Sequence, residues 1–489
     1  MTTEHGTETT LDSTTKITRV STQESTQART QARIQESSPD STSDSTPAPT
    51  ARAAHPTPAP MAPLAVRSFT ASSALGLGLD ALHRAVAEQR SSLLANTWKG
   101  ANGAALACFV GRMPALDDSA LPAPWNAWDC RATRLAWQAL QADGFADAAR
   151  AAVQRHGAAR VGLVLGSSAS TIGASELAYR KLAPDGGFPA ELRAPALHSP
   201  HAVTAFVAQA LSLAGPAVTV STACSSSARA FGQAERWLRL GLVDAVVVGG
   251  VDALCDSVLY GFHALGLVAP TPCQPFDAQR CGISVGEGAG FVLLERADPV
   301  GDTGTHDGLQ LWGYGEASDA HHMSSPHPQG LGAERALDDA LARAKTAAEN
   351  IDFVHLHGTA TPQNDAVEAA LVARRYSHAV HACATKGLTG HTMGAAGVLG
   401  AVVCLLALRT GLRAGTAQLQ TMDPALGPRF AQQLRRLPTV APVRATVSHA
   451  FGFGGNNSVL VFGHGHGHGH GQGQGQVQAR GQGQGQGRA

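Results

Sequence analysis

The sequence lacks the features that mark secreted and membrane proteins. The first sixty residues are polar, without the apolar core of a signal peptide, and their scattered acidic residues do not suit a transit peptide. The longest uncharged apolar stretch, Thr392 to Leu408, is shorter than the roughly 20 residues that a membrane-spanning helix needs. We therefore expect a soluble, cytoplasmic protein with no membrane span, in which this stretch forms a buried helix.

A net charge and paired cysteines are also missing. Lys and Arg number 37 and Asp and Glu number 37, so the bulk charge does not indicate a nucleic-acid or membrane-surface partner. The 8 cysteines are scattered, with no CxxC pair and no zinc-type spacing, which indicates reduced thiols in a reducing compartment. A chain of 489 residues exceeds the usual size of a single core, so we expect two domains or two tightly joined halves.

Both ends of the chain have low-complexity composition. Residues 1–61 are dominated by Thr, Ser, Gln, Pro and Ala, which bury too little surface to offset the entropy of ordering, and we expect them to be disordered. Residues 464–489 form a Gly/His/Gln tail. Its alternating histidines would bind a divalent metal weakly, although a flexible tail without a required role is the simpler interpretation.

Between these ends, short β-branched runs alternate with helical patterns. The predicted strands are 161–166, 217–222, 245–250, 291–295, 309–315 and 353–356. The predicted helices are 201–215, closed by Gly215, the segment after Cys224, and about 332–349. Strands that alternate with helices predict βαβ units, and hence an α/β protein with a mostly parallel sheet covered on both faces.

Cys224 lies in the stretch "VSTACSSSARAFG", at the turn from a predicted strand into a predicted helix. The free N–H groups and the positive dipole end of a helix N-terminus stabilise a thiolate, and the small neighbours of Cys224 leave room for a substrate. A nucleophile is one interpretation of this position. The other is a buried cysteine that acts as a small hydrophobic residue.

The segment "HLHGTATPQNDAVEAALV" favours the nucleophile. His357 directly follows the predicted strand 353–356 and so lies at its carboxyl end, where α/β sheets place ligands. The hydroxyls of Thr359 and Thr361 lie beside it, whereas His355 alternates with His357 and is interpreted as structural. A lone histidine is more often a satisfied core residue, so the argument depends on the combination.

A second segment, "ATKGLTGHTMGAAG", adds a lysine and another histidine. Lys386 and His391 lie in a Gly-rich loop at the mouth of the apolar helix, where a buried charge is costly unless it is paired. Asp365 and Glu368 share one face of the preceding helix, and Glu368 is the candidate counter-ion.

The third segment is "SHAFGFGGNNSVLVF", residues 448–462. Its glycines, interleaved with Phe451 and Phe453 just before a strand, suit a tight loop that presents backbone N–H groups to a ligand. Half of an oxyanion hole and an ordinary β-turn are both compatible with this pattern.

Six motifs together resemble one family: "TACSSS", "GEGAG", "SDAHHMSSP", "HGTATPQND", "TKGLTGHTMGAAG" and "FGFGGNN". In this order and spacing they look like the elongating β-ketoacyl-[acyl-carrier-protein] synthases of the thiolase superfamily, over roughly residues 63–462. The resemblance implies the thiolase fold, in which two similar α/β halves form a five-layered α-β-α-β-α core. Residues 62–300 would be the half with the nucleophile and residues 301–463 the half with the histidines. It also implies a homodimer, or a heterodimer with a related ketosynthase-like subunit.

The resemblance further implies a role for each residue. Cys224 would accept an acyl chain from the phosphopantetheine of acyl carrier protein, and His357 and His391 would stabilise the enolate formed when malonyl-carrier protein loses CO2. The N–H groups of Cys224 and Phe453 would form the oxyanion hole, and Phe453 would also act as a mobile gate. The substrate or pantetheine arm would contact Thr359, Thr361, Phe451 and Phe453. Lys386, Asp365 and Glu368 would hold and tune the histidines. Such a condensation needs an activated thiol and hydrogen-bond donors, so we expect no metal and no organic cofactor.

The sequence departs from the family pattern in several places. Cys281 stands where an acidic residue is usual, and both low-complexity ends lie outside the pattern. Residues 129–140 and 167–181 look more like the synthases of bacterial aryl-polyene pathways. Three alternatives fit less well: a thiolase would carry a second cysteine in the C-terminal Gly-rich loop, a starter synthase would use Cys-His-Asn, and a non-condensing chain-length subunit would lack the nucleophile.

Overall fold

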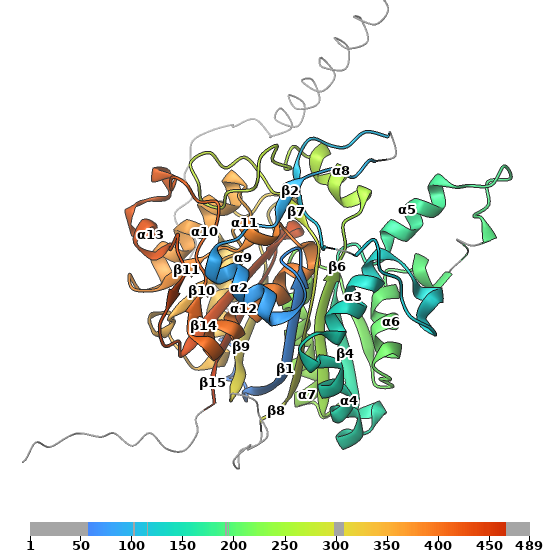
Figure 1. Cartoon of the computed structure of the whole chain (residues 1–489). Coiled ribbons are helices and arrows are strands. Elements are labelled where there is room, and N and C mark those ends of the chain that lie inside the picture. The colour runs from blue at the N-terminus through green and yellow to red at the C-terminus, as the bar shows by residue number, and fades with distance from the viewer. Residues whose placement is uncertain are drawn as a thin grey trace, which may run out of the picture. The chain divides into compact units, whose positions relative to one another are not determined.

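The computed structural model describes residues 57–100, 103–114, 116–190, 193, 195–297 and 308–465 (Figure 1). Most of the segment that we expect to be disordered, up to residue 56, and the tail from residue 466 lie outside the described residues. The expected boundary near residue 300 lies in the undescribed stretch 298–307. The described chain is ordered slightly earlier than residue 62, since Met61 is buried and its N–H donates to the carbonyl of Arg343 at 3.1 Å.

Among the described residues, ten strands form one continuous sheet in the order β11-β10-β14-β15-β9-β1-β8-β6-β4-β5. The first-half strands are β1 (Leu64–Ser73), β4 (Val161–Gly166), β5 (Ala217–Val220), β6 (Ala245–Asp252) and β8 (Gly288–Arg296). The second-half strands are β9 (Leu309–Ser318), β10 (Phe353–His355), β11 (His381–Cys383), β14 (Ala445–Gly452) and β15 (Asn456–His464). The short pairing of β1 with β9 joins the two halves.

The two halves repeat one topology. Numbered along the chain within each half, the strands lie in the order 1-5-4-2-3 both times. In each half the pairs 1/5 and 5/4 are antiparallel, and the pairs 4/2 and 2/3 are parallel. The expectation of two similar halves is thus confirmed, whereas the prediction of a mostly parallel sheet is wrong. The first and last strands of each half run against their neighbours, which an alternation of strands and helices along the sequence does not reveal.

Helices lie on both outer faces of the sheet and between the halves (Figure 1). The outer helices of the first half are α3 (Arg131–Gln141), α4 (Phe145–His156) and α6 (Ala202–Ala210), and those of the second half are α9 (Leu331–Ala344), α10 (Pro362–Arg375) and α13 (Pro428–Gln433). In the middle, α7 (Ser226–Arg239) and α12 (Ala396–Thr410) pack on each other and contact strands of both halves. This arrangement is the five-layered α-β-α-β-α core.

The strand β4 shows why the layers form. Val164 packs in the central cluster with α7 and α12, whereas Leu163 and Leu165 pack in the outer cluster with α3, α4 and α6. Successive side chains of a strand point to opposite faces, so a run that is apolar throughout requires cover on both sides. The sequence "VGLVLG" therefore predicts the strand and both helical layers.

The helix α12 contains the longest apolar stretch. The window Met393–Thr410 is long and apolar enough to cross a membrane by length and composition, but 78% of it is buried inside the fold. It contacts β8 and β6 on one side and β14 and β10 on the other, which is the position of a core helix. The prediction of a buried helix is therefore confirmed.

Two predicted helices are shorter than expected. The helix predicted over 201–215 ends at Ala210, because Ser212 turns the chain with a φ of 56°. The helix predicted to about residue 349 ends at Ala344, since Lys345 adopts a left-handed φ of 51°. The remaining elements are α2 (Gly78–Glu88), β2 (Leu93–Ala95), β3 (Phe109–Gly111), α5 (Ile172–Arg180), α8 (Asp256–Ala264), β7 (Val285–Gly286), α11 (Lys386–Thr389), β12 (Leu412–Arg413) and β13 (Thr439–Val440).

Candidate active site

Cys224 lies in a sharp turn between β5 and α7, two residues before the helix begins. Ala223 has a φ of 52°, and the hydroxyls of the following serines hold the turn. Ser225 Oγ donates to the carbonyl of Thr222 at 2.9 Å, and Ser226 Oγ donates to the carbonyl of Ala223 at 2.5 Å. The small polar residues around Cys224 thus build the turn, and the thiol is 5% exposed.

The two predicted catalytic histidines meet Cys224. His391 Nε2 lies 3.0 Å from Cys224 Sγ. The ring centroids of His357 and His391 are 5.5 Å apart, with an interplanar angle of 85°. Donor atoms of all three side chains lie within 4.8 Å of one another, and all three residues are buried. Segments that are far apart in the sequence therefore converge on one point.

A cysteine thiolate and two imidazoles are also ligand types that Zn²⁺ binds. Among the described residues, Cys224, His357 and His391 form the group with a spacing suited to a metal ion. The same three side chains would have to be free to act on a thioester, so metal binding and condensation would compete for this position.

Two charged residues hold the His357 loop. The carboxylate of Glu368 accepts the N–H of His357 at 2.7 Å and the N–H of Gly358 at 2.8 Å. The ammonium of Lys386 donates to the carbonyl of His357 and lies 3.5 Å from its Nδ1. Because an ammonium group can only donate, Nδ1 serves as the acceptor and the ring proton lies on Nε2.

Burial controls the protonation of the site. It lowers the pKa of His357 and of His391 well below the ordinary value, with the charge of Lys386 acting in the same direction, so both rings are neutral at neutral pH. It also raises the pKa of the Cys224 thiol to about 11, although Lys386 and the N–H groups of Phe453 and Cys224 favour the thiolate. The N–H groups thus act in the expected direction, but desolvation outweighs them and the thiol stays protonated in the resting site.

The predicted oxyanion donors lie at the nucleophile. The N–H groups of Cys224 and Phe453 lie near enough to the sulfur to favour its thiolate form. Phe453 opens the tight turn 453–455, in which Gly454 and Gly455 have φ of 74° and 70°, conformations that favour glycine. The Phe453 ring packs on Phe262 of α8 with centroids 5.6 Å apart, and Phe262 is a contact that the sequence did not indicate.

The remaining predicted residues lie around this centre. The Phe451 ring lies 5.9 Å from the ring of His357. The hydroxyls of Thr359 and Thr361 bond to each other at 2.9 Å beside His357. Asp365 contacts neither histidine. Its carboxylate accepts the N–H of Phe276 at 2.7 Å and the N–H of Ala360 at 3.2 Å, so it supports the loops rather than the rings.

Asp252, at the end of β6, is a buried residue that the sequence analysis missed. Its carboxylate accepts the Ser168 N–H at 2.8 Å and the Gly394 N–H at 2.6 Å. Ser168 Oγ donates to the carbonyl of Ala223 at 3.3 Å, and Gly394 follows His391 closely in the chain. One carboxylate therefore ties the nucleophile turn to the His391 loop. The available signal was a single acidic residue closing the apolar run "AVVVGGVD".

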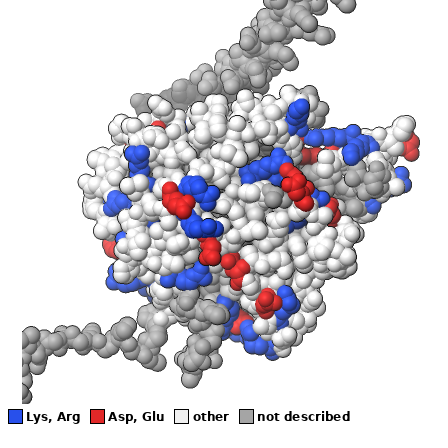
Figure 2. Space-filling model, in the orientation of Figure 1, with Lys and Arg blue, Asp and Glu red and all other residues white. Residues whose placement is uncertain are grey.

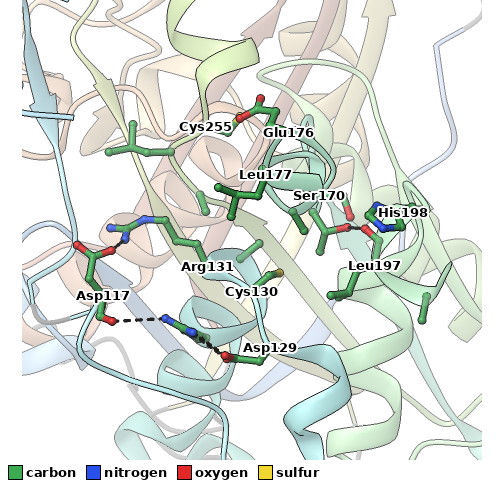
Figure 3. A pocket seen from close by; sticks show the side chains of 18 of the residues that line it. Asp117, Asp129, Cys130, Arg131, Ser170, Glu176, Leu177, Leu197, His198 and Cys255 are labelled. Atoms are coloured by element: carbon green, nitrogen blue, oxygen red, sulfur yellow. Dashed lines mark hydrogen bonds and ion pairs between the residues drawn. The ribbon is translucent and has the colours of Figure 1, made fainter. Parts of the chain in front are cut away.

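A cavity of about 750 Å³ lies between α3, α5 and the end of β6 (Figure 3). Its apolar wall includes Leu177, Leu197 and Leu254. Two of its arginines form ion pairs: Arg131 with Glu287 at 2.5 Å, and Arg134 with Asp129 at 2.5 Å. The volume lies in the range of ligand-binding sites. Cys281, the departure noted in the sequence, is exposed and lines no part of this cavity.

Comparison with known proteins gives a consistent result. The model of the β-ketoacyl synthase N-terminal domain matches residues 129–299, and that of the C-terminal domain matches residues 310–420. Nodulation protein E of Rhizobium meliloti (strain 1021) is 33% identical over 309 residues, which cover 62% of this chain and 76% of the relative. The mitochondrial 3-oxoacyl-[acyl-carrier-protein] synthase of Arabidopsis thaliana is 35% identical over 261 residues, which cover 51% of this chain and 56% of the relative.

Among solved structures, the complex of the ketosynthase ApeO with its chain length factor ApeC from Xenorhabdus doucetiae is similar to this protein. The match has a TM-score of 0.73 and 30% sequence identity, and it covers 84% of this chain and 100% of that chain. Since the models of both family domains match in order along the chain, and the fold is shared as well, this protein belongs to the β-ketoacyl synthase family.

Proposed function

We propose that this protein is a condensing enzyme that joins an acyl group held on Cys224 to the malonyl group of malonyl-[acyl-carrier-protein]. The products are 3-oxoacyl-[acyl-carrier-protein] and CO2. The observation that carries the proposal is the 3.0 Å contact between Cys224 Sγ and His391 Nε2, with the His357 ring beside it. The curated relatives named as 3-oxoacyl-[acyl-carrier-protein] synthases support the carrier-bound substrate.

The first half-reaction loads the acyl chain. The thiol is protonated at rest, so His391 Nε2 accepts its proton as Sγ attacks the thioester carbonyl. The N–H groups of Cys224 and Phe453 hold the negative oxygen of the tetrahedral intermediate. When the intermediate collapses, the pantetheine sulfur leaves and takes the proton back from His391. The acyl group then remains on Cys224 as a thioester.

The second half-reaction forms the new carbon–carbon bond. The malonyl carboxylate leaves as CO2, and the electrons of the broken bond form an enolate whose oxygen accepts hydrogen bonds from His357 Nε2 and from His391. His391 Nδ1 has no hydrogen-bond partner among the described residues, so this ring can carry its proton on either nitrogen. The carbanion attacks the thioester carbon on Cys224, whose sulfur leaves as a thiolate. The thiolate then takes up one proton from solvent by way of His391, and this is the one proton that the overall reaction consumes. These steps require neither a metal nor an organic cofactor.

We propose that the reaction elongates a fatty-acid, polyene or polyketide chain. The resemblance of residues 129–140 and 167–181 to aryl-polyene synthases supports the polyene class within this set. A non-condensing chain-length subunit is the alternative. The contact of Cys224 with His391 speaks against it, because such a subunit has no use for a nucleophile and its base.

We further infer that the active form is a dimer, either of this chain or with a related ketosynthase-like chain. The edge of the sheet at β5 has no neighbouring strand among the described residues. Four large apolar side chains on and beside α5 are exposed, namely Ile172, Leu177, Tyr179 and Leu182. The ApeO–ApeC pair supports an association of this kind.

On the face shown in Figure 2, basic and acidic side chains alternate and leave no extended surface of one sign.

Acyl transfer onto the purified protein tests the proposed function. Intact-protein mass spectrometry after incubation with an acyl-carrier thioester is expected to show one added acyl group on the wild type and none on Cys224→Ala. Cys281→Ala, which removes an exposed cysteine, serves as the matched control and is expected to acylate normally. An acylated Cys224→Ala variant, or a wild type that accepts no acyl group, would disprove the proposed function.

A further inference from the structure

A chain of three buried side chains lies behind the catalytic histidine. His449, on β14, is placed between Glu368 of α10 and Tyr376, the first residue after that helix. His449 Nδ1 lies 3.0 Å from Glu368 Oε1, and His449 Nε2 lies 2.9 Å from the hydroxyl of Tyr376. None of the three is more than 2% exposed. Buried polar groups in such a row are costly unless each has a partner, and here each has one.

The direction of the protons can be assigned. The carboxylate of Glu368 can only accept, so His449 Nδ1 carries a proton and donates to it. This is a hydrogen bond to a carboxylate, of the stronger, charge-assisted kind. In the neutral ring Nε2 has no proton and is the acceptor for the hydroxyl of Tyr376.

The carboxylate of Glu368 connects this chain to the catalytic ring. The oxygen that receives His449 also accepts the N–H of His357, and the second oxygen accepts the N–H of Gly358. The loop has little freedom: Gly358 has a φ of 42°, and a Cβ there would come within 2.5 Å of the Cβ of Ala384. Any movement of the Glu368 carboxylate therefore moves the backbone of His357.

We propose that His449 and Tyr376 are positioning residues for decarboxylation, acting through Glu368 to hold the His357 ring where it meets the enolate oxygen. This inference rests on the proposed function. Acyl transfer onto Cys224 depends instead on His391 and on two backbone N–H groups, none of which contacts His449 or Tyr376 by a hydrogen bond. Loss of the chain should therefore slow decarboxylation far more than it slows acylation.

The test compares the two half-reactions in the same variants. His449→Leu removes the hydrogen bond to Glu368 and is expected to lower the rate of malonyl-[acyl-carrier-protein] decarboxylation about 10- to 100-fold, the range for a hydrogen bond to a charged group. The rate of Cys224 acylation should stay within about twofold. His449→Asn keeps an N–H in place of Nδ1–H and is expected to restore most of the decarboxylation rate. Tyr376→Phe should lower it by about 2- to 10-fold, as for a neutral hydrogen bond.

A second buried histidine provides the control. His381 of β11 bonds the carbonyl of Ala414 at 2.6 Å and touches none of the catalytic side chains by a hydrogen bond. His381→Leu should lower the melting temperature while leaving the ratio of the two rates at its wild-type value. The proposal is overturned if His449→Leu changes both rates equally, or neither, or if His449→Asn restores nothing. If His449→Leu does not fold, the milder Tyr376→Phe and His449→Asn variants decide. Failure of the wild type to decarboxylate would instead refute the proposed function.

Discussion

At the residue scale, the thiol of Cys224 is held in the form that cannot attack. Desolvation raises its pKa to about 11 from an ordinary 9.0, so Lys386 and two N–H groups only partly offset burial. The neutral His391 ring, with Nε2 at 3.0 Å from Cys224 Sγ, accepts the thiol proton when the sulfur attacks. The nucleophile is thus activated by its partner and not by its place before a helix.

This protonation state predicts the pH dependence of thiol labelling. In a Cys281→Ala background, the rate at which iodoacetamide alkylates Cys224 should rise about tenfold per pH unit through pH 8–10, with no plateau below about pH 11. The folded state holds this proton more tightly than the unfolded chain, so its contribution to stability is present below about pH 9 and is lost as the pH rises toward 11. A labelling plateau near pH 8, measured by peptide mass spectrometry, would contradict the raised pKa.

Lys386 lowers the pKa of His357. After burial, its positive charge is the largest cause that lowers the pKa of His357, so Lys386→Met should let that pKa rise. The neutral form of His357 is the one assigned to decarboxylation, and protonation removes it. The acid limb of the pH profile of the decarboxylation rate should therefore move to higher pH in the variant. The pH profile of CO2 release measures this shift, and an unmoved or lowered limb would show that Lys386 does not tune the ring.

The residues that sequence alone could predict are those in loops with unusual composition. Cys224 and His357 lie in turns after predicted strands, and Lys386 and His391 lie in a Gly-rich loop. Polar side chains have no structural reason to gather in these places. Other parts of the site, such as Asp252 and His449, lie within strands, where a lone polar residue is the sole signal and does not indicate a partner. Their contacts exist only after distant loops converge, so no spacing along the chain could reveal them.

At the scale of elements, the close packing of α7 and α12 sets the distance between nucleophile and base. A Cβ at Gly397 would come within 2.5 Å of the backbone nitrogen of Ala228, so only glycine permits this approach. Ser227 of α7 also donates to the carbonyl of Gly394 at 2.5 Å and accepts the N–H of Val398 at 2.9 Å. Because His391 lies just before α12, a shift of this helix would move His391 away from Cys224.

The packing predicts the effect of a larger residue at this contact. Gly397→Val should cost about 1–3 kcal/mol of stability through overpacking and should slow both half-reactions, because the base is displaced from the thiol. Thermal unfolding and the acylation rate provide the measurements. Gly261→Ala in α8 is the control, since a Cβ there meets nothing within 4 Å, and it should leave the stability unchanged or slightly raised. Equal stability of Gly397→Val and wild type would show that the helices tolerate separation.

Secondary structure was largely readable from the sequence, but strand direction was not. The apolar runs of β4, β6 and β10 identify buried strands, because a strand covered on both faces must be apolar throughout. Whether β8 is parallel or antiparallel to β6 depends on the path that the long connecting segment takes between them. That path is fixed by tertiary packing, so the prediction of a mostly parallel sheet failed. The six predicted strands are all present, whereas β1, β11 and β14 were not predicted.

At the scale of the whole molecule, the repeated topology explains where the site lies. Cys224 follows β5, the third strand of the first half, and precedes α7; Lys386 and His391 follow β11, the third strand of the second half, and precede α12. The two central helices are therefore equivalent elements of the two halves, packed against each other. Cys224 and His391 lie shortly before equivalent helices of the two halves. The packing of the two halves against each other therefore brings the nucleophile and the base together.

The same scale carries the prediction of a dimer. Leu177 and Tyr179 of α5 are 50% and 67% exposed, and β5 is an edge of the sheet among the described residues. An exposed apolar cluster and an open strand edge are both surfaces that monomeric proteins avoid. We expect sedimentation velocity to show a dimer for the wild type at micromolar concentration, because a second chain buries this cluster.

Charges placed on the cluster should separate the two chains. Leu177→Glu combined with Tyr179→Glu is expected to shift the protein to the monomer, since association would have to desolvate two carboxylates without partners. Leu437→Glu adds one charge at an equally apolar position that is 65% exposed in another part of the chain, and it should leave the dimer intact. A monomeric wild type would exclude the homodimer and leave a related ketosynthase-like chain as the partner to be sought by co-expression. A dimer that survives the double substitution would show that the chains meet elsewhere than at α5.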